Sequence, residues 1–188
     1  MGKALSDMTL EELWELFPIM LTEPDEKWPG LYAEEKKRLT GILPQAGIRI
    51  SHIGSTAIHG IWAKPIIDIL VELPVSLSTE RVKEILTSNG YTCMSEQPGR
   101  ASFNMGYTNE GFAEKVFHLH LRYRGDNNEL YFRDYMNDHA DLAKQYEAMK
   151  LSLWKQFEHD RDGYTAAKTD FIAEKTDEAT KFYGNKYS

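Results

Sequence analysis

The stretch from Arg49 to Leu73 constrains the fold of this chain more than any other part of its sequence. It predicts a strand, a tight Gly54-Ser55 turn, a short bridging segment, and a second strand with one carboxylate, Asp68, in an apolar run. A buried carboxylate costs free energy unless another group pairs with it. A glycine–serine turn offers backbone N–H groups and a hydroxyl to an anion. We therefore predict a site for a phosphate group and a metal ion.

Side chains alternate between the faces of a strand, which places Asp68, Leu70 and Glu72 on one face of the second strand. Asp68 and Glu72 are then about 13 Å apart on an ideal strand, too far for both to bind one metal ion directly. Asp68 is therefore the stronger candidate ligand. The alternative is that Asp68 caps nearby backbone or pairs with Lys64 or an arginine.

A later strand, expected over residues 115–125, carries His118 and His120. Alternation places both imidazoles on one face, about 7 Å apart along the chain. Neutral imidazoles on one face can chelate a divalent ion, and a carboxylate from a neighbouring strand would complete the set. The alternative is a pair of histidines that are hydrogen-bonded on a half-buried sheet surface.

The turn itself supplies candidate phosphate ligands. Gly54 permits close approach of the backbone, while Ser55 and Thr56 either cap the following segment or contact a phosphate. Lys64 follows before the second strand, where it either neutralises a bound phosphate or lies in solvent.

The C-terminal part contributes weaker candidates. Arg133 and Asp134 are a charged pair between aromatic residues, read either as an anion contact or as a structural ion pair. Asp160, Tyr164 and Lys168 follow one another at a spacing of four, which predicts a shared helix face with a solvated or packing role.

The composition limits the class of protein. A chain of 188 residues with a formal net charge of −7 is long enough for one domain with a proper core. The negative charge argues against binding of bulk nucleic acid and leaves open a local basic pocket. The single Cys93 excludes an internal disulfide and a cysteine-based zinc site, which fits a reducing cytoplasm. We expect no membrane partner, because there is no signal-peptide pattern or membrane-spanning apolar run.

The order of the expected elements predicts an α+β fold. Helices are expected near Thr9 and over 31–44, then from Ser78 to Asn89, and from Glu129 onward, with strands in the middle of the chain. This pattern indicates a mixed sheet with helices packed at the N- and C-terminal ends. We expect a single domain over 1–188, in which 1–27 is a helical N-terminal extension.

Five blocks of sequence resemble the GrpB family over residues 28–171, namely HIGSTAIHGIWAKPIIDILVEL, FHLHLRY, LYFRDYM, YEAMKLSLW and YTAAKTDFI in this order. GrpB proteins are small bacterial proteins, sometimes fused to a coenzyme A biosynthesis kinase. They are assigned to the nucleotidyltransferase-like fold of the polymerase-beta type. The resemblance implies that fold for this chain.

The usual signature of that fold is a Gly-Ser or Gly-Gly turn followed by Asp-x-Asp or Asp-x-Glu on a strand. The resemblance therefore implies that a triphosphate rests on Gly54 and Ser55 and that Asp68 binds the catalytic magnesium. Leu70 stands where the second carboxylate is expected. One carboxylate cannot alone hold the two ions, about 3.5–4 Å apart, of a two-metal mechanism.

Alternation suggests a remodelled metal site made of Asp68, His118 and His120, with help from His52 or Glu72. Imidazole and carboxylate ligands suit zinc, manganese, iron or nickel better than magnesium, which prefers oxygen ligands. The identity of the divalent metal ion (Mg, Mn or Zn) stays open.

Three functions remain open. The first is nucleotidyl or phosphoryl transfer on a small nucleotide or another phosphorylated substrate. The second is a metal-dependent phosphohydrolase that uses Asp68, His118 and His120. The third is a non-catalytic module with a degenerate active site that binds a nucleotide or a partner. The oligomeric state is not determined by the sequence.

Overall fold

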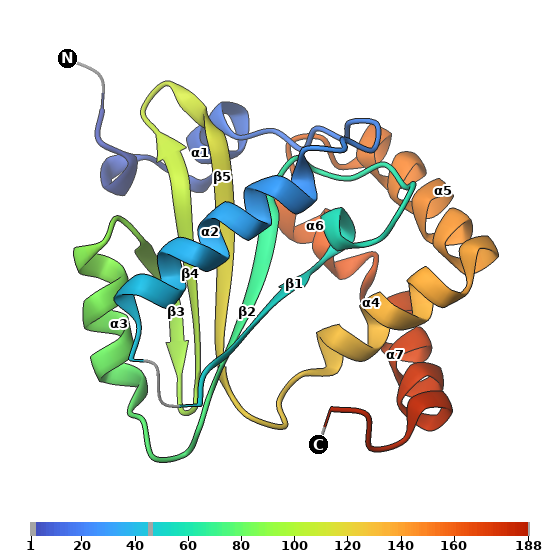
Figure 1. The fold of residues 1–188 in the computed structure, drawn as a ribbon. Helices are drawn as coiled ribbons and strands as arrows, with labels where there is room; N and C mark the ends of the chain where they lie inside the picture. The colour runs from blue at the N-terminus through green and yellow to red at the C-terminus, as the bar shows by residue number, and fades with distance from the viewer. Residues whose placement is uncertain (1–2, 45–46, 188) are drawn as a thin grey trace.

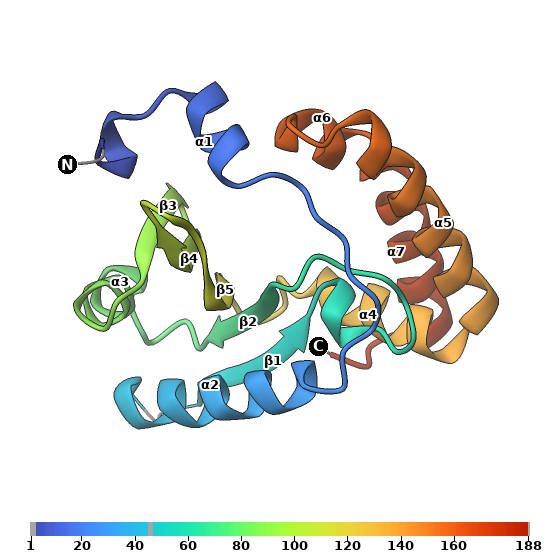
Figure 2. The ribbon, with the colours of Figure 1, turned by 90° about the horizontal axis from the view of Figure 1, so that it is seen from above.

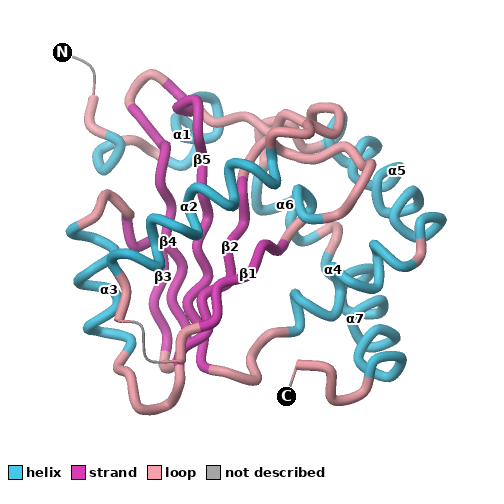
Figure 3. Tube along the Cα trace, viewed as in Figure 1, coloured by secondary structure: helices cyan, strands magenta, loops and turns pink. Residues whose placement is uncertain are grey.

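The computed structural model describes residues 3–44 and 47–187. Its centre is a five-stranded mixed sheet in the order β1-β2-β5-β4-β3 (Figures 1 and 3). The strands are β1 (Arg49–Ile53), β2 (Ile67–Leu73), β3 (Thr92–Gln97), β4 (Arg100–Thr108) and β5 (Gly111–Tyr123). The predicted α+β fold with a mixed sheet is confirmed.

Helices precede, interrupt and follow the strands. They are η1 (Leu5–Asp7), α1 (Leu10–Leu16), α2 (Trp28–Ile42), η2 (Ser55–Ala57), α3 (Thr79–Ser88), α4 (Asn128–Asp138), α5 (Ala140–Gln156), α6 (Arg161–Ala166) and α7 (Thr169–Tyr183). Figure 2 shows α4 to α7 gathered beyond the side of the sheet where β1 and β2 lie. The prediction of one domain with a helical extension stays a prediction.

The pairing of β2 positions the candidate site. β2 lies between β1, with which it pairs antiparallel, and β5, with which it pairs parallel. In the parallel register Asp68 lies opposite His118, and Leu70 lies opposite His120. Residues that face each other across two strands point to the same side of the sheet, so this register brings the carboxylate and the imidazoles together.

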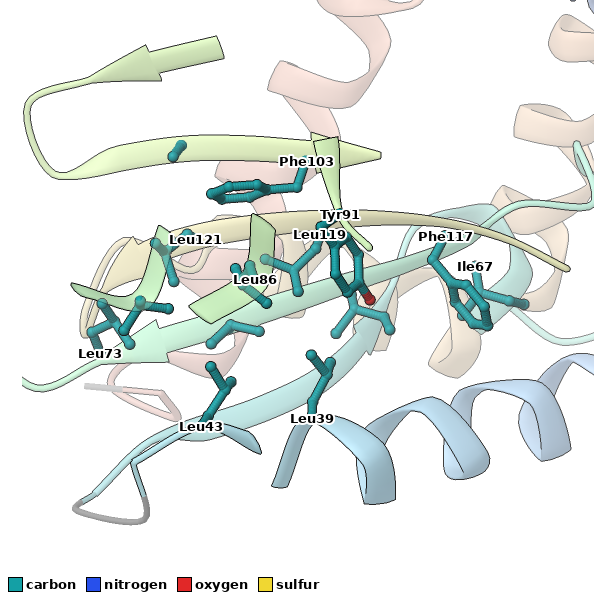
Figure 4. Packing of buried hydrophobic residues seen from close by; sticks show 14 of the residues in the cluster. Leu39, Leu43, Ile67, Leu73, Leu86, Tyr91, Phe103, Phe117, Leu119 and Leu121 are labelled. Carbon is teal, nitrogen blue, oxygen red and sulfur yellow. The ribbon is translucent and has the colours of Figure 1, made fainter. Parts of the chain in front are cut away.

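The opposite side chains of β2 and β5 form the main core under α2 and α3 (Figure 4). The cluster includes Leu39 of α2, Leu43 directly after it, Leu86 of α3, and alternate residues of the two central strands, Ile67, Ile69, Val71, Leu73, Phe117, Leu119 and Leu121. Apolar burial of this kind is the dominant favourable contribution to folding. The alternation that buries these residues leaves Asp68 and the histidines on the other face.

Local signals in the sequence explain some of the helix starts. Thr9 and Glu12 form a capping box, and the Ser78 hydroxyl accepts a hydrogen bond from the Arg81 N–H group. The helical region expected from Glu129 onward is interrupted at His139, because its φ of −128° and ψ of 79° are not helical. In the described part of the chain, no helix combines the length and the apolar character needed to cross a bilayer.

Candidate functional site

The turn after β1 lies directly on Asp68. Gly54 has a φ of +71°, a conformation that favours glycine. A Cβ atom at Gly54 would lie 2.9 Å from Cβ and Cγ of Asp68, and closer still to Oδ2. Only a residue without a side chain allows the turn to sit this close to the carboxylate. The predicted link between the Gly54-Ser55 turn and Asp68 is therefore a direct contact in space.

Two imidazoles approach the other carboxylate oxygen. The Nδ1 atom of His118 lies 3.4 Å from Oδ1 of Asp68, and the Nε2 atom of His120 lies 3.5 Å from the same oxygen. Burial alone raises the pKa of the Asp68 carboxyl, but hydrogen bonding and charge from the two histidines outweigh it and hold the pKa well below its usual range. Asp68 is therefore an ionised carboxylate at neutral pH.

A hydrogen-bonded chain reaches the other ring nitrogen of His118. Arg161 Nη2 donates to the Tyr107 hydroxyl oxygen at 3.0 Å, and that hydroxyl lies 2.8 Å from His118 Nε2. The ionised Asp68 carboxylate can only accept, so the Nδ1 atom of His118 that faces it acts as a donor. The Tyr107 hydrogen is then available to bond to Nε2.

This arrangement does not fit the metal centre of the fold. Among the described residues, no group of three or more His, Cys, Asp or Glu side chains could hold a metal ion. Leu70, at the position of the second carboxylate, is 0% exposed and packs with Ile53 and Leu130.

The two residues expected to help Asp68 have other partners. Glu72 is 0% exposed and accepts hydrogen bonds from Arg49 Nη2 at 2.6 Å and from Asn127 Nδ2 at 2.9 Å. His52 Nε2 lies 3.0 Å from Thr56 Oγ1. Burial lowers the pKa of His52 to about 4, which keeps this imidazole neutral at pH 7. Neither side chain joins the carboxylate.

A cavity of about 300 Å³ opens beside Asp68 and contains an unusual concentration of cations. Lys64 comes from the loop before β2, Lys150 from α5, Arg161 from α6, and Lys168 from the residue before α7. The remaining wall is formed by Leu21, Ser55, Thr56, Ile66, Asp68, His118, Asp162, Tyr164 and Thr165. The site is thus assembled from the sheet, from α5 and α6, and from the residue that precedes α7.

None of these four cations forms an ion pair with a carboxylate within residues 3–44 and 47–187. Burial lowers the pKa of Lys64 and of Lys150 to about 7, and that of Lys168 to about 8. The lysines also lower one another's affinity for protons, since the charge of Lys168 acts on both other lysines. Lys150 is buried, whereas Lys64 and Lys168 are half-buried. Lysines that lose contact with water and have no carboxylate partner are costly in free energy, and such groups cluster at functional sites.

Aromatic faces and one carbonyl partly replace the missing carboxylates. The ammonium groups of Lys64 and Lys168 lie 4.8 and 4.0 Å from the centre of the Tyr164 ring. Lys150 donates to the Trp62 carbonyl oxygen and lies 4.7 Å from the centre of the Tyr146 ring. These contacts hold the cations in place without cancelling their charge. A polyanion is the ligand that would neutralise such a cavity.

The structure brings most of the predicted site residues together. Ser55, Thr56, Lys64, Asp68 and His118 all line the cavity. Gly54 lies next to it, against Asp68, and His120 contacts Asp68 from the side.

Arg133 is not brought into the cavity. Its guanidinium donates to Oδ1 of Asp134 at 2.6 and 2.8 Å and to the carbonyl oxygen of His52 at 2.7 Å. This geometry matches the structural ion pair that was the alternative interpretation, and it uses the donors that an anion would need.

Sequence reasoning missed Tyr107, Lys150 and Arg161, and it assigned Lys168 to a solvated or packing face. Lys150 had a detectable signal, because it continues the buried face of α5 that also holds Ala143 and Tyr146. A lysine at such a position is unusual unless it is paired, so its presence was a signal. Tyr107 and Arg161 had no such signal.

Comparison with known proteins places the chain in a family. The model of the family described as GrpB protein matches residues 18–178. The glutamate-rich protein GrpB of Alkalihalophilus pseudofirmus is 35% identical over 162 residues, covering 83% of this chain and 92% of that protein. A UPF0157 protein of Bacillus subtilis is 34% identical over 153 residues, or 79% of this chain. This chain spans 43% of the length of that relative, and 62% of a similar one from Pseudomonas aeruginosa.

Solved structures agree with this assignment. The crystal structure of the conserved protein GrpB from Enterococcus faecalis matches with a TM-score of 0.73 and 29% identity, covering 87% of this chain and 99% of that one. Structures of the Cid1 poly(U) polymerase match more weakly, with a TM-score of 0.48 and 10% identity for one of them, a level that says nothing about activity. With the family model covering most of its residues, this chain belongs to the GrpB family.

Proposed function

We propose that this chain binds the phosphates of a nucleotide, or of another small phosphorylated ligand, in the cavity beside Asp68, and carries out nucleotidyl or phosphoryl transfer there. One observation carries the proposal: Lys64, Lys150, Arg161 and Lys168 converge on one cavity without a carboxylate partner among the described residues. A chain with a net charge of −7 that concentrates positive charge in one cavity is suited to hold a polyanion there.

Each group has a distinct part in this proposal. The lysines and Arg161 neutralise the phosphate oxygens, and Ser55 offers a hydroxyl at the edge of the cavity. Asp68 accepts a hydrogen bond from the hydroxyl group of an acceptor molecule. The acceptor oxygen forms the new bond to phosphorus as the bond to the leaving phosphate or pyrophosphate breaks, the cations of the cavity neutralise the leaving group, and the hydroxyl proton passes to solvent. Its low pKa makes Asp68 a weak base, so its contribution is orientation more than complete removal of the proton.

The predicted divalent metal ion (Mg, Mn or Zn) at Asp68, His118 and His120 stays a prediction. An ion of this kind would supply charge neutralisation and Lewis acidity at the transferred phosphate. Among the described residues no group of three or more His, Cys, Asp or Glu side chains could hold such an ion, so no step of the proposal depends on it. We therefore assign the neutralisation of the phosphates to the four cations of the cavity.

A non-catalytic nucleotide-binding module is the second candidate. The observation that favours it is Leu70, which is fully buried in an apolar cluster at the place of the second carboxylate. Under this alternative the cavity still binds phosphates, but Asp68 contributes only to shaping the site.

Isothermal titration calorimetry tests the proposal with inorganic triphosphate and the four common nucleoside triphosphates, each with and without Mg²⁺ or Mn²⁺. We expect binding by the wild type, and binding at least tenfold weaker in Lys64→Met and Lys168→Met, because each variant removes one phosphate-facing charge. The matched control is Lys37→Met, which alters an exposed lysine on α2. Equal binding by all four proteins, or by none, would refute the proposal.

A second measurement separates the two candidate functions. Release of pyrophosphate or orthophosphate from the bound ligand is measured for the wild type and for Asp68→Asn. Transfer predicts turnover that the variant loses while its affinity stays within about threefold. No turnover by the wild type, with any small hydroxyl-bearing acceptor added, favours the binding module.

A further inference from the structure

A second hollow continues from the cation cavity and has a different chemical character. It is a cleft of about 750 Å³ between α4, α5 and α7, and it begins at Gly54. We propose that this cleft binds the neutral, ring-bearing part of the phosphorylated ligand, a nucleoside or a group of similar size and chemistry. This inference rests on the proposed function, because it assumes that the phosphates occupy the cavity.

The first argument is continuity. Ser55, Asp68, Thr165 and Lys168 line both the cavity and the cleft. The two hollows therefore meet at Asp68. A ligand with its phosphates among the lysines and its organic part in the cleft passes directly by the carboxylate, which is where a transferred phosphorus atom must lie.

The second argument is charge. Beyond the junction, the cleft contains two acidic residues, and both have cationic partners. Asp177 Oδ2 is paired with Lys181 at 2.6 Å, and Glu129 lies 3.9 Å from an Arg122 nitrogen. The cleft thus lacks the uncompensated positive charge of the cavity. The cleft therefore favours a neutral group over a phosphate group.

The third argument is the chemistry of the walls. Phe132, Tyr146, Ile172 and Ala173 provide an apolar surface from three helices. Ligand sites typically combine apolar walls of this kind with a few polar groups that fix orientation. A volume of about 750 Å³ is also within the usual range of about 300–1,000 Å³ for small-molecule sites.

Threonines on α7 supply the polar groups. The Thr176 hydroxyl donates to the Ile172 carbonyl oxygen at 2.6 Å, and the Thr180 hydroxyl donates to the Asp177 carbonyl oxygen at 2.9 Å. Because each hydroxyl hydrogen is already used, each oxygen is left as an acceptor. The cleft therefore favours a ligand that donates hydrogen bonds, such as a sugar hydroxyl or a ring amine.

Calorimetry on one ligand series tests the inference. The series is inorganic triphosphate, the four nucleoside triphosphates and the four nucleosides. We expect at least one nucleoside triphosphate to bind tenfold or more tightly than inorganic triphosphate, because its organic part adds contacts in the cleft. The variant Ala173→Trp fills the cleft from an exposed position on α7. It should abolish the tenfold gain and leave the affinity for inorganic triphosphate within about twofold of the wild type.

The matched control is Ala148→Trp, which adds the same side chain at an exposed position of α5 outside the cleft. It should retain the gain. If inorganic triphosphate does not bind to the wild type, the proposed function itself is wrong. If triphosphate binds and no nucleoside improves on it, or if Ala173→Trp keeps the gain, the phosphate site stands and the assignment of the cleft is overturned.

Discussion

The clearest physical consequence of the cation cavity is a stability that depends on pH through Lys150. This side chain is 1% exposed, and burial lowers its pKa from 10.5 to about 7. The charges that face it are those of Lys168 and Lys64, which lower the pKa further, and that of Glu147, which raises it. In the unfolded chain the same amine titrates at its ordinary value.

The sign follows from linkage. Between about pH 7 and 10.5 the unfolded chain holds a proton on Lys150 that the folded protein has released, so the free energy of unfolding rises with pH in that window. One proton corresponds to about 1.4 kcal/mol per pH unit. From pH 6 to pH 9.5 the total attributable to Lys150 is about 3 kcal/mol.

The perturbation is Lys150→Met, which keeps a long apolar side chain and removes the titrating group. Urea unfolding is measured at intervals from pH 6 to 9.5 for the wild type, for the variant, and for Lys155→Met as an exposed control on the same helix. The lost hydrogen bond to the Trp62 carbonyl lowers the stability of the variant equally at every pH, so only the change with pH is interpreted. We expect the stability of the wild type relative to the variant to increase by about 3 kcal/mol over the range. An increase below about 1 kcal/mol would show that burial does not lower the pKa of Lys150 in the folded protein, and the argument for a polyanion site would lose its basis.

Three further results are expected. Gly54→Ala should lower the free energy of unfolding by about 1–3 kcal/mol more than Gly60→Ala. Both glycines have a φ near +70°, but only the Cβ at Gly54 would overlap Asp68. Equal urea midpoints for the two variants would contradict this. Tyr107→Phe should shift the imidazole nitrogen resonances of His118 and lower stability by about 1–3 kcal/mol, whereas unchanged ¹⁵N spectra would mean that the hydroxyl does not set the proton on Nε2. The protein should take up protons when it binds triphosphate at pH 8, because a bound anion raises the lowered pKa values of the cavity lysines. Calorimetry in buffers of different ionisation enthalpy measures this uptake, and a binding enthalpy that is the same in all buffers would rule it out.

The part of the site carried by strands was predictable from the sequence. The two-residue period of a strand is rigid, so Asp68, His118 and His120 could be assigned to faces before the pairing of β2 with β5 was known. The Gly54 turn was also identifiable, because its contact with Asp68 spans a short stretch of sequence.

The cation cavity was not predictable in the same way. Lys150 and Arg161 reach Asp68 only because α5 and α6 pack beyond the β2 side of the sheet, a tertiary arrangement that no local pattern encodes. Arg133 shows that a suitable residue type can also mislead a prediction. Its guanidinium could bind an anion, but it donates to its sequence neighbour Asp134 and to the His52 carbonyl oxygen.

The distribution of charge around the cavity also has a consequence for motion. Lys64 belongs to the loop before β2, whereas Lys150, Arg161 and Lys168 belong to the C-terminal helices, so like charges repel across the boundary between these two parts. Local opening in native proteins occurs preferentially where the free-energy cost of separation is lowest. We expect amide hydrogens of the six-residue helix α6 to exchange faster than those of the central strands, and to slow when a polyanion bridges the boundary. In this way the ligand would be a structural part of the folded protein, joining the sheet to the helices that complete its binding site.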